Sequence, residues 1–399
     1  MKSDWKEETL GSLVKFSSGG TPNKKNPNYW NGTILWISAK NMKSEVIETS
    51  DLTITEEGLI HGSKLAPKDS VLLLVRGSGL FNGIPVCYVK NSVAYNQDVK
   101  CIESISELEN KYLFYWFKAS SDYLQKKLEF TGIGAGKIDT RLLSNLVIRF
   151  PDKVTRKKII DLADNISDRI SINKKINENL EQQLATLFAH TFAEDIAVAS
   201  TETCPKLGDL ITVIDNRGKT PPLTTEIRDY PIIDVGALKG TGRIVDFNNC
   251  TKYVDQSTYE TWFRSGHPKP WDILISTVGS LAEMKIYLGS KGCMAQNVVA
   301  LRATSISPLY LYQYLRFIRA DLVAYNIGSV QPSIKVTHIV KHPIFVPERV
   351  KLVNFEEAAK AVTNQLYTNY NENESLKELR DTLLPKLMSG ELDVSDLDL

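Results

Sequence analysis

Residues 159–187, IIDLADNISDRISINKKINENLEQQLATL, contain no proline or glycine and repeat an apolar side chain at intervals of three or four residues. This spacing predicts a long helix with one narrow apolar stripe. Residues 355–383, FEEAAKAVTNQLYTNYNENESLKELRDTL, repeat the pattern. Because each stripe is narrow, we expect the two helices to pair with each other as a coiled coil. The alternative is two separate amphipathic helices, each lying on its own domain.

The predicted seam of this coiled coil is the set of apolar positions that would face the partner helix. Its members are Ile159, Leu162, Ile166, Ile170, Ile176, Leu180, Leu184, Phe355, Val362, Leu366, Leu376 and Leu383. Asn173, Asn369 and Asn373 lie on the same stripes. An asparagine inside a seam lowers stability but can fix the register of the helices.

The two helices belong to two copies of one longer unit. Gly132, Ile138, Ile148 and Pro151 recur 196 residues later as Gly328, Ile334, Ile344 and Pro347. Residues 10–13 (LGSL) resemble residues 207–210 (LGDL), and residues 97–99 (QDV) resemble residues 296–298 (QNV). An ordered series of matches at a nearly constant offset indicates a duplication of about 200 residues, which is too long for a solenoid repeat.

Each copy begins with short β-rich runs separated by turns and ends with its long helix, so the expected class is α+β. Within the β-rich parts we expect one helix near Tyr112 and another near Tyr310. The predicted domains are residues 1–152 (module 1), 153–199 (first long helix), 200–348 (module 2) and 349–399 (second long helix and tail).

Composition narrows the class of protein. The 399 residues include 48 Lys and Arg and 47 Asp and Glu, a net charge of +1. This balance argues against a strongly basic histone-like binder and against an acidic disordered chain. No apolar run approaches the roughly 18 residues that span a membrane. Five scattered cysteines without a Cys-x-x-Cys pair favour a reducing compartment, so we expect a cytoplasmic protein with no membrane association.

Three short stretches resemble one family. Residues 19–22 (GGTP) and 29–32 (YWNG) precede the first strand runs, and residues 384–392 read LPKLMSGEL. With the alternation of modules and helices, the chain resembles the specificity (S) subunit of type I restriction–modification systems over nearly its whole length. Module 2 departs from the first motif, since residues 217–221 read RGKTP. Different target sequences would require such divergence.

The resemblance implies a function. Each module would be a target recognition domain that reads one half of a bipartite site in double-stranded DNA. The helices would pack antiparallel as a spacer and bind two methyltransferase (M) subunits, and restriction (R) subunits would join them. The chain would be non-catalytic within an enzyme that methylates adenine N6 and cuts unmethylated DNA. It would hold no cofactor, and S-adenosylmethionine, ATP and magnesium would lie on the partner subunits.

The candidate DNA-binding residues of module 1 lie in and beyond a basic segment. Residues 15–43 contain five lysines and no Asp or Glu. Lysines and hydroxyls contact phosphates, whereas Arg, Asn and Gln read base edges. The candidates are Thr21, Lys24, Lys25, Lys40, Asn41, Arg76, Asn96, Gln97 and Lys137. A solvated basic loop is the alternative for the segment, and a structural ion pair is the alternative for Arg76.

Module 2 offers candidates at comparable positions, with a weaker electrostatic signal. Residues 215–243 carry five basic and four acidic side chains. The candidates are Arg217, Lys219, Thr220, Lys239, Gln296, Asn297 and Lys335. Residues 132–137 (GIGAGK) and 328–331 (GSVQ) form matched loops that could approach a DNA backbone closely.

Two other functions stay open. A stand-alone DNA adenine methyltransferase is one alternative. Residues 26–29 (NPNY) resemble the Asn-Pro-Pro-Tyr motif of amino-methyltransferases, but Asn28 replaces the second Pro and no glycine-rich strand–turn–helix for S-adenosylmethionine is evident, so we interpret them as a turn. A coiled-coil scaffold without DNA binding is another. Residues 132–137 fail as a P-loop because Ile138 replaces the required Ser or Thr. His338 and His342 lie in an expected strand, where their spacing does not favour a metal site.

The resemblance also predicts a role for helix length. A helix from about Thr155 to about Ala189 would be roughly 50 Å long, and major-groove faces recur about every 34–36 Å along DNA. We expect that inserting or deleting about four residues near Asn177 changes the number of unread base pairs while both half-sites stay the same. Methylation mapping tests this, and an unchanged spacer would contradict it.

Overall fold

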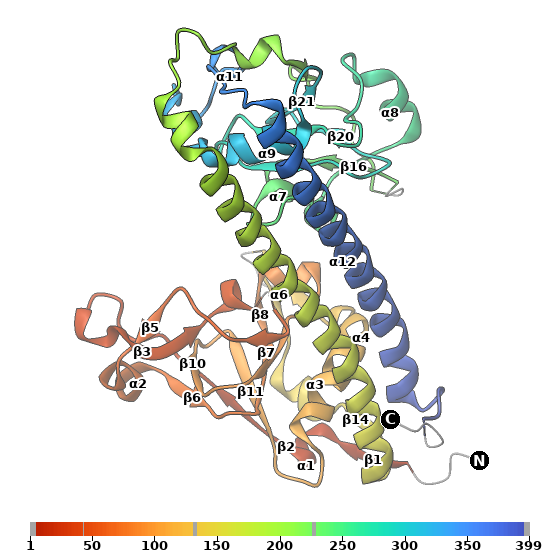
Figure 1. The fold of residues 1–399 in the computed structure, drawn as a ribbon. Coiled ribbons are helices and arrows are strands. Elements are labelled where there is room, and N and C mark those ends of the chain that lie inside the picture. The colour runs from red at the N-terminus through yellow and green to blue at the C-terminus, as the bar shows by residue number, and fades with distance from the viewer. Residues whose placement is uncertain (1–4, 43, 131–133, 226–228, 395–399) are drawn as a thin grey trace. The chain divides into compact units, whose positions relative to one another are not determined.

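The computed structural model describes residues 5–42, 44–130, 134–225 and 229–394. The chain forms two compact units (Figure 1). Unit 1 comprises residues 1–170 and 374–399, and unit 2 comprises residues 171–373. Each unit therefore contains one β-rich module and a part of both long helices.

Unit 1 is built around a five-stranded sheet of order β2-β11-β7-β9-β4. Its strands are β2 (Val14–Ser18), β11 (Val99–Ser104), β7 (Val71–Leu74), β9 (Val86–Val89) and β4 (Val46–Ile47). The pairs are antiparallel except β4–β9, which is parallel. All four β7 side chains are buried, as expected of a central strand covered on both faces.

Smaller sheets and helices complete module 1. A four-stranded sheet has the order β5 (Thr53–Ile54), β3 (Trp30–Ile37), β10 (Val93–Tyr95) and β6 (Lys64–Ala66). A three-stranded sheet has the order β12 (Glu129–Phe130), β13 (Gly136–Lys137) and β8 (Arg76–Gly77). The third sheet pairs β1 (Lys6–Thr9) with β14 (Val147–Phe150). The helices are α1 (Leu10–Leu13), α2 (Glu56–Gly62), α3 (Asn110–Ala119), α4 (Ser121–Gln125) and α5 (Thr140–Ser144).

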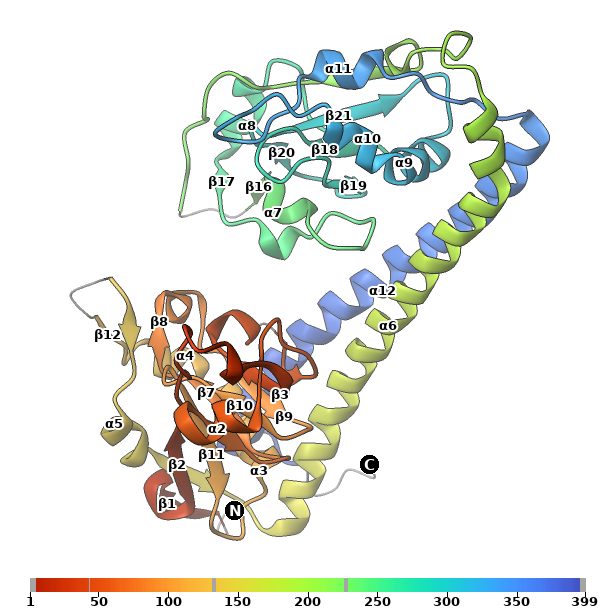
Figure 2. The same ribbon diagram turned by 90° about the vertical axis from the view of Figure 1, so that its left-hand side faces the viewer.

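Unit 2 repeats the central arrangement with the strand order β15-β21-β18-β19. Figure 2 labels β21, β18 and β19 of this sheet. These strands are β15 (Ile211–Ile214), β21 (Val298–Ala303), β18 (Ile273–Ser276) and β19 (Met284–Ile286). They correspond in sequence and order to β2, β11, β7 and β9, and all three pairs are antiparallel. The duplication expected from the sequence is thereby visible in the sheet topology.

A second sheet and short helices surround the central sheet of module 2. The strands are β17 (Tyr253–Val254), β16 (Tyr230–Ile233) and β20 (Cys293–Met294) in that order. The helices are α7 (Val235–Leu238), α8 (Gln256–Trp262), α9 (Pro308–Phe317), α10 (Arg319–Ala324) and α11 (Val336–Lys341). The strand expected around His338 is wrong: this residue lies in α11, and the His342 ring bonds the Tyr325 hydroxyl at 2.9 Å.

The two long helices are α6 (Lys153–Val198) and α12 (Arg349–Ser389). Asp152 caps α6 by accepting hydrogen bonds from the backbone N–H groups of Val154 and Thr155 at 2.8 and 3.1 Å. The helix continues nine residues beyond Ala189, the end that was used to estimate its length, and lies within the predicted segment 153–199. Phe188 and Phe192, which follow the last apolar position of the predicted pattern, are both fully buried.

The helices pair antiparallel, as the resemblance implies. In unit 2, Asn173 Nδ2 donates to Asn373 Oδ1 at 3.0 Å, and Asn369 Nδ2 donates to Asn177 Oδ1 at 2.8 Å. The step from Asn173 to Asn177 along α6 is thus matched by the step from Asn373 back to Asn369 along α12, which means that the helices run in opposite directions. These amide pairs fix the register of the two helices.

Most predicted seam positions point inward, but one prediction is wrong. The buried members are Ile159, Ile166, Ile170, Leu184, Phe355 and Leu366, and the partly buried members are Leu162, Leu180, Val362, Leu376 and Leu383. Ile176 is instead 40% exposed. Asn177 occupies the inward position beside it, because the helix pair is hydrogen-bonded here and not closed by apolar contacts.

Each unit has its own hydrophobic core, to which the long helices contribute. In unit 1 the sheet and α3 bury Ile159 and Ala163 of α6 with Leu384 and Leu387 of α12. In unit 2, Leu184, Phe188 and Phe192 of α6 and Phe355 of α12 pack against α9 and the sheet. The helices are therefore structural parts of both modules.

Candidate nucleic-acid interface

Each module contains the same exposed threonine–glutamine pair. The Thr21 hydroxyl donates to Gln97 Oε1 at 2.8 Å, and Gln296 Nε2 donates to the Thr220 hydroxyl at 2.9 Å. Both pairs join residues 76 positions apart. All four residues are candidates from the sequence, and the structure pairs the threonine with the glutamine in both modules, although the glutamine accepts the hydrogen bond in module 1 and donates it in module 2. The hydrogen bond fixes the orientation of each amide.

The basic loop before β3 is held in place by two tryptophans. Trp36 Nε1 donates to the Gly20 carbonyl at 3.0 Å, and Trp30 Nε1 donates to the Asn23 carbonyl at 3.2 Å. Gly19 is required, because a Cβ here would lie 1.9 Å from the Tyr95 carbonyl oxygen. The anchored loop presents a row of polar side chains to solvent.

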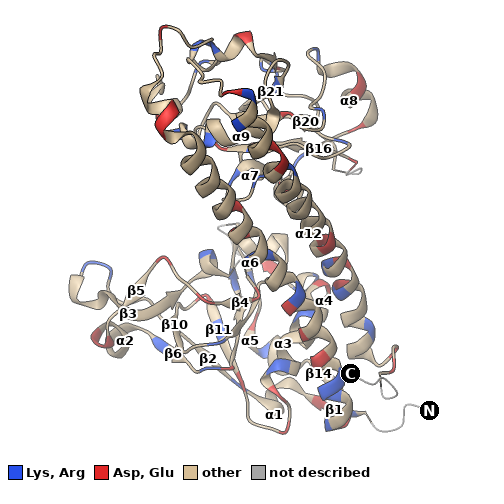
Figure 3. Ribbon diagram, in the orientation of Figure 1, with Lys and Arg blue, Asp and Glu red and all other residues tan. Residues whose placement is uncertain are grey.

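Three candidate lysines of module 1 are available to bind phosphates. Lys24, Lys25 and Lys40 are exposed, and within the described part of the chain none lies within ion-pair distance of a carboxylate. Lys43, the last lysine of the basic segment, lies outside the described residues. Figure 3 shows cationic residues on the loops of both units and mixed charge along the long helices.

Two asparagine candidates of module 1 instead support local turns. Asn96 is only 6% exposed and exchanges hydrogen bonds of 3.1 Å with the backbone N–H and the carboxylate of Asp98. Asn41 Oδ1 accepts hydrogen bonds from the backbone N–H and hydroxyl of Ser38 at 3.1 and 3.2 Å. Sequence reasoning could not separate these turn-forming amides from ones that face solvent.

Arg76 and Lys137 are neighbours across the β8–β13 pair. Lys137 lies 3.6 Å from the carboxylate of Asp139 and 3.8 Å from that of Glu129. Arg76 is exposed and makes no ion pair with the described residues, which removes the structural alternative considered for it. The matched glycine loop is described here only from Gly134, so Gly132 and Ile133 lie outside the described residues.

Module 2 presents fewer uncommitted cations. The Arg217 guanidinium binds the Asp215 carboxylate at 2.5–2.9 Å. Burial would raise the pKa of Asp215, but its hydrogen bonds with Arg217 outweigh this and lower the pKa below its ordinary value. Lys219, Lys239 and Lys335 are exposed. The Asn297 side-chain oxygen is buried without a hydrogen-bond partner among the described residues.

The second glycine loop exposes an apolar tip. Asn326 Oδ1 accepts from the backbone N–H groups of Gly328 and Ser333 at 3.0 and 2.9 Å, which closes the loop. Val330 at its tip is 99% exposed. In both modules the residue after this loop bonds the residue that follows the central strand, β7 or β18. Ile138 N donates to the Val75 carbonyl at 2.9 Å, and Ile334 N donates to the Thr277 carbonyl at 2.8 Å.

Residues 26–29, which resemble a methyltransferase motif, form a local turn. Asn26 accepts a hydrogen bond of 3.1 Å from Asn28 N and caps the short 3-10 helix Pro27–Tyr29. Among the described residues no group of three or more His, Cys, Asp or Glu side chains is arranged to hold a metal ion. No described helix is long and apolar enough to cross a membrane.

Sequence reasoning missed two groups of partly or fully buried ions that connect the modules to the long helices. Glu45, Lys118 and Arg380 form one group, and Glu181, Arg243 and Arg316 form the other. Arg243 had been counted among the basic side chains of module 2, yet it is 1% exposed. The sequence contains one sign that these charged residues occupy matched positions. Arg243 follows Glu45, and Arg316 follows Lys118, by the same 198 residues.

Comparison with known proteins agrees with this architecture. Residues 2–182 match the family model of the type I restriction modification DNA specificity domain. The EcoR124I/EcoR124II specificity subunit of Escherichia coli is 32% identical over 163 residues, 40% of this chain and 40% of that protein. The MjaIX specificity subunit of Methanocaldococcus jannaschii is 25% identical over 99% of this chain and 95% of that protein.

A solved structure has the same fold. The type I restriction–modification S subunit from M. genitalium aligns over 97% of both chains with a TM-score of 0.52 and 17% identity. The chain is thus similar to specificity subunits of type I restriction–modification systems over nearly its whole length, and its N-terminal part matches their DNA specificity domain.

Proposed function

We propose that the two modules read the two halves of a bipartite DNA target. The observation that carries this is the matched pair, Thr21–Gln97 in module 1 and Thr220–Gln296 in module 2. Glutamine amides pair with base edges in the major groove, and an amide held by a threonine enters that contact already oriented. The exposed lysines around each pair would contact phosphates and set the position of the module.

The long helices would scaffold the methyltransferase subunits. Outside the seam, α6 carries a second apolar row formed by Ile172, Ile176 and Leu187, which are 50, 40 and 38% exposed. Polar residues beside Leu187, among them Gln183 and His190, line a shallow surface depression. Exposed apolar side chains with a polar surround are typical of protein interfaces. Restriction subunits would join the resulting complex.

In this proposal the chain performs no chemistry itself. The partner subunits would hold S-adenosylmethionine, ATP and magnesium, and the methyltransferase subunits would modify adenine N6. Binding of labelled S-adenosylmethionine by the purified chain separates this proposal from a stand-alone methyltransferase. Stoichiometric binding by the isolated chain would overturn it, and a well-folded chain that binds neither DNA nor a methyltransferase would favour the scaffold.

Replacing one glutamine should relax only one half of the target. Gln97→Ala removes the base contact of module 1 and Gln296→Ala that of module 2, each reducing discrimination at one position by about 1–3 kcal/mol. Methylation mapping of a host that expresses each variant with its methyltransferase partner measures this. The two variants are matched controls for each other. The same change in the target from both would contradict the assignment of one half-site to each module.

Replacing two lysines of the basic loop should weaken binding to all DNA sequences alike. Lys24→Ala with Lys25→Ala removes two phosphate contacts. The slope of the logarithm of the binding constant against the logarithm of salt concentration should therefore become shallower by about 2, or about 1 per contact. Lys126→Ala with Lys127→Ala is the matched control, an exposed adjacent pair in the same module outside the loop. Binding by the assembled complex is measured over a range of salt concentrations. Equal losses from both pairs would mean that the loop has no special role.

A further inference from the structure

Each module is attached to the long helices by a group of partly or fully buried ions. We call the group of Glu45, Lys118 and Arg380 junction 1, and the group of Arg243, Arg316 and Glu181 junction 2. In each group the first two residues belong to the module and the third belongs to a long helix. Junction 1 lies within unit 1 and junction 2 within unit 2.

The module residues of the two junctions are structural equivalents. The Glu45 carbonyl accepts from Tyr88 N at 2.7 Å, and the Arg243 carbonyl accepts from Ile286 N at 2.5 Å. The next residue in each case pairs in parallel with the same strand of its sheet, β9 in unit 1 and β19 in unit 2. Lys118 and Arg316 are each the ninth residue of the ten-residue helices α3 and α9.

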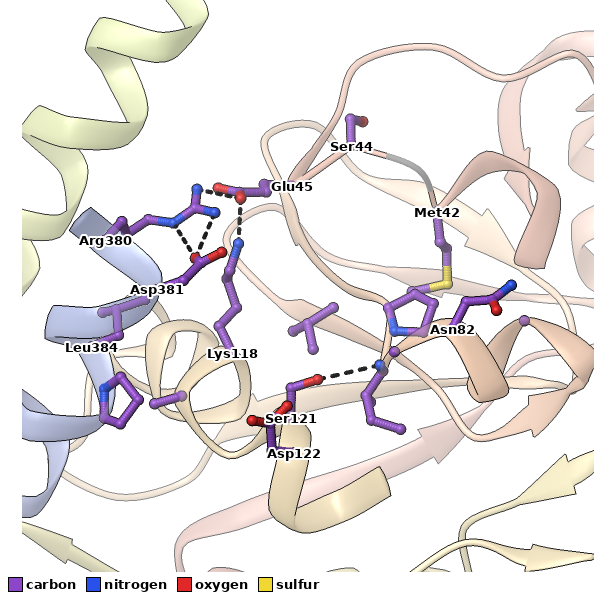
Figure 4. A pocket seen from close by; sticks show the side chains of 17 residues that line it. Met42, Ser44, Glu45, Asn82, Lys118, Ser121, Asp122, Arg380, Asp381 and Leu384 are labelled. Carbon is purple, nitrogen blue, oxygen red and sulfur yellow. Dashed lines mark hydrogen bonds and ion pairs between the residues drawn. The ribbon is translucent and has the colours of Figure 1, made fainter. Parts of the chain in front are cut away.

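In junction 1 an anion of the module faces a cation of the helix. The Glu45 carboxylate bonds both Lys118 and Arg380, and Arg380 also binds the Asp381 carboxylate at 2.9 Å (Figure 4). The Arg380 side chain is 7% exposed. Burial raises the pKa of Glu45, but the two cations outweigh this and hold the pKa below its ordinary value. A cavity of about 510 Å³ adjoins the group.

In junction 2 the charges of the first and third residues are reversed, whereas the second residue is again a cation. The Arg243 side chain is fully buried, and its Nε and Nη2 atoms bind the two Glu181 carboxylate oxygens of α6 at 3.0 and 2.9 Å. Arg243 Nη1 also donates to the Thr363 hydroxyl of α12 at 3.0 Å. Arg316 Nη1 reaches Glu181 at 3.1 Å. One helix anion thus serves two module cations.

This reversal matters when a module meets the wrong helix. A module 1 in the position of module 2 would bring Glu45 toward Glu181, and a module 2 in the position of module 1 would bring Arg243 toward Arg380. Like charges that are removed from water repel strongly, and each would also lose its native partner. The modules share a fold, so shape alone does not forbid the exchange.

We propose that the opposite charges of the two junctions assign each module to its own position on the helices. If each module reads its own half-site, as the proposed function holds, the junctions also fix the order of the half-sites. Glu45 and Arg243 are then positioning residues that select a place in the chain and do not contact DNA.

The test uses full-length chains in which module 1 replaces module 2, so that module 1 is present twice. In one variant the second copy keeps its own Glu45, and in the other it carries Glu45→Arg. We expect the Tm of the second variant to be higher by roughly 10 °C, since it restores the arginine that Glu181 requires. The same Glu45→Arg substitution in the first copy is the control and should lower the Tm.

Equal stability of the two duplicated variants would overturn the proposal. If neither duplicated variant folds, the proposal is tested by exchanging the charges of Glu45 and Arg380 in a chain that keeps its native modules. Glu45→Arg and Arg380→Glu should each lower the Tm, and together they should restore most of the loss, because the double variant has the charge set of junction 2. Additive losses in this cycle would also overturn the proposal. These measurements need no DNA, so a failure of the proposed function would appear separately, as a stable wild-type chain that does not bind DNA.

Discussion

Arg243→Ala is expected to lower the free energy of unfolding of unit 2 by about 3–5 kcal/mol. The substitution leaves the Glu181 carboxylate, 7% exposed, with the partly exposed Arg316 as its remaining ion-pair partner among the described residues. It also removes the hydrogen bond to Thr363 and the contact of the guanidinium with the Tyr312 ring, whose centre lies 5.3 Å away. Urea denaturation followed by tryptophan fluorescence measures the change.

The control for this variant is another arginine of module 2 that binds a carboxylate nearer the surface. Arg217 pairs with Asp215, and both side chains are about one-third exposed. Arg217→Ala should change the stability by no more than about 1 kcal/mol, because exposed ion pairs contribute little. A loss for Arg243→Ala as small as the loss for Arg217→Ala would show that the buried position of Arg243 is not what makes its ion pair important.

Phe188→Ala should lower the stability of unit 2 by about 3–5 kcal/mol as well, through a cavity in the core. The Phe188 side chain is fully buried, and its ring centre lies within 5.1–5.6 Å of four other aromatic rings. These rings belong to Phe192 of α6, Tyr310 and Phe317 of α9, and Phe355 of α12. The substitution removes a shared contact of three helices.

The neighbouring residue on the same helix provides a matched control. Leu187 is 38% exposed, so Leu187→Ala should change the stability by only about 0.5 kcal/mol. Both variants have similar helix propensity at the mutated position, which isolates the effect of burial. Denaturation of both proteins under the same conditions gives the comparison. Similar losses would mean that the aromatic cluster does not hold the helices to module 2.

The repeat and the paired helices could be predicted because they depend on local periodicity and on matches along the chain. Residues 10–13 and 207–210 reveal the duplication without any knowledge of packing. Ile176 was misplaced for a physical reason: the apolar pattern favours it, but hydrogen-bonded asparagines occupy the inward positions at that level. A pattern of apolar residues cannot locate a polar segment of an interface.

The candidate site could be predicted only in part. Gln97 and Gln296 were found because the repeat places them at matched positions. Asn96, by contrast, looks the same in the sequence but points into its own turn. Arg243 was only counted among the basic residues of module 2, and its burial could not be foreseen because its partner Glu181 lies 62 residues earlier in the sequence. Burial of a charge depends on tertiary partners, which composition and spacing do not reveal.

The amide pairs between α6 and α12 have a consequence for how such a chain can evolve. Asn173 recognises Asn373 and Asn177 recognises Asn369, so lengthening one helix alone between these two levels would separate donors from acceptors. An insertion between Asn173 and Asn177 therefore keeps both amide pairs only if α12 gains a matching insertion between Asn369 and Asn373. Changes in helix length should be inherited as coupled events in the two halves of the gene, whereas the modules between them remain free to diverge.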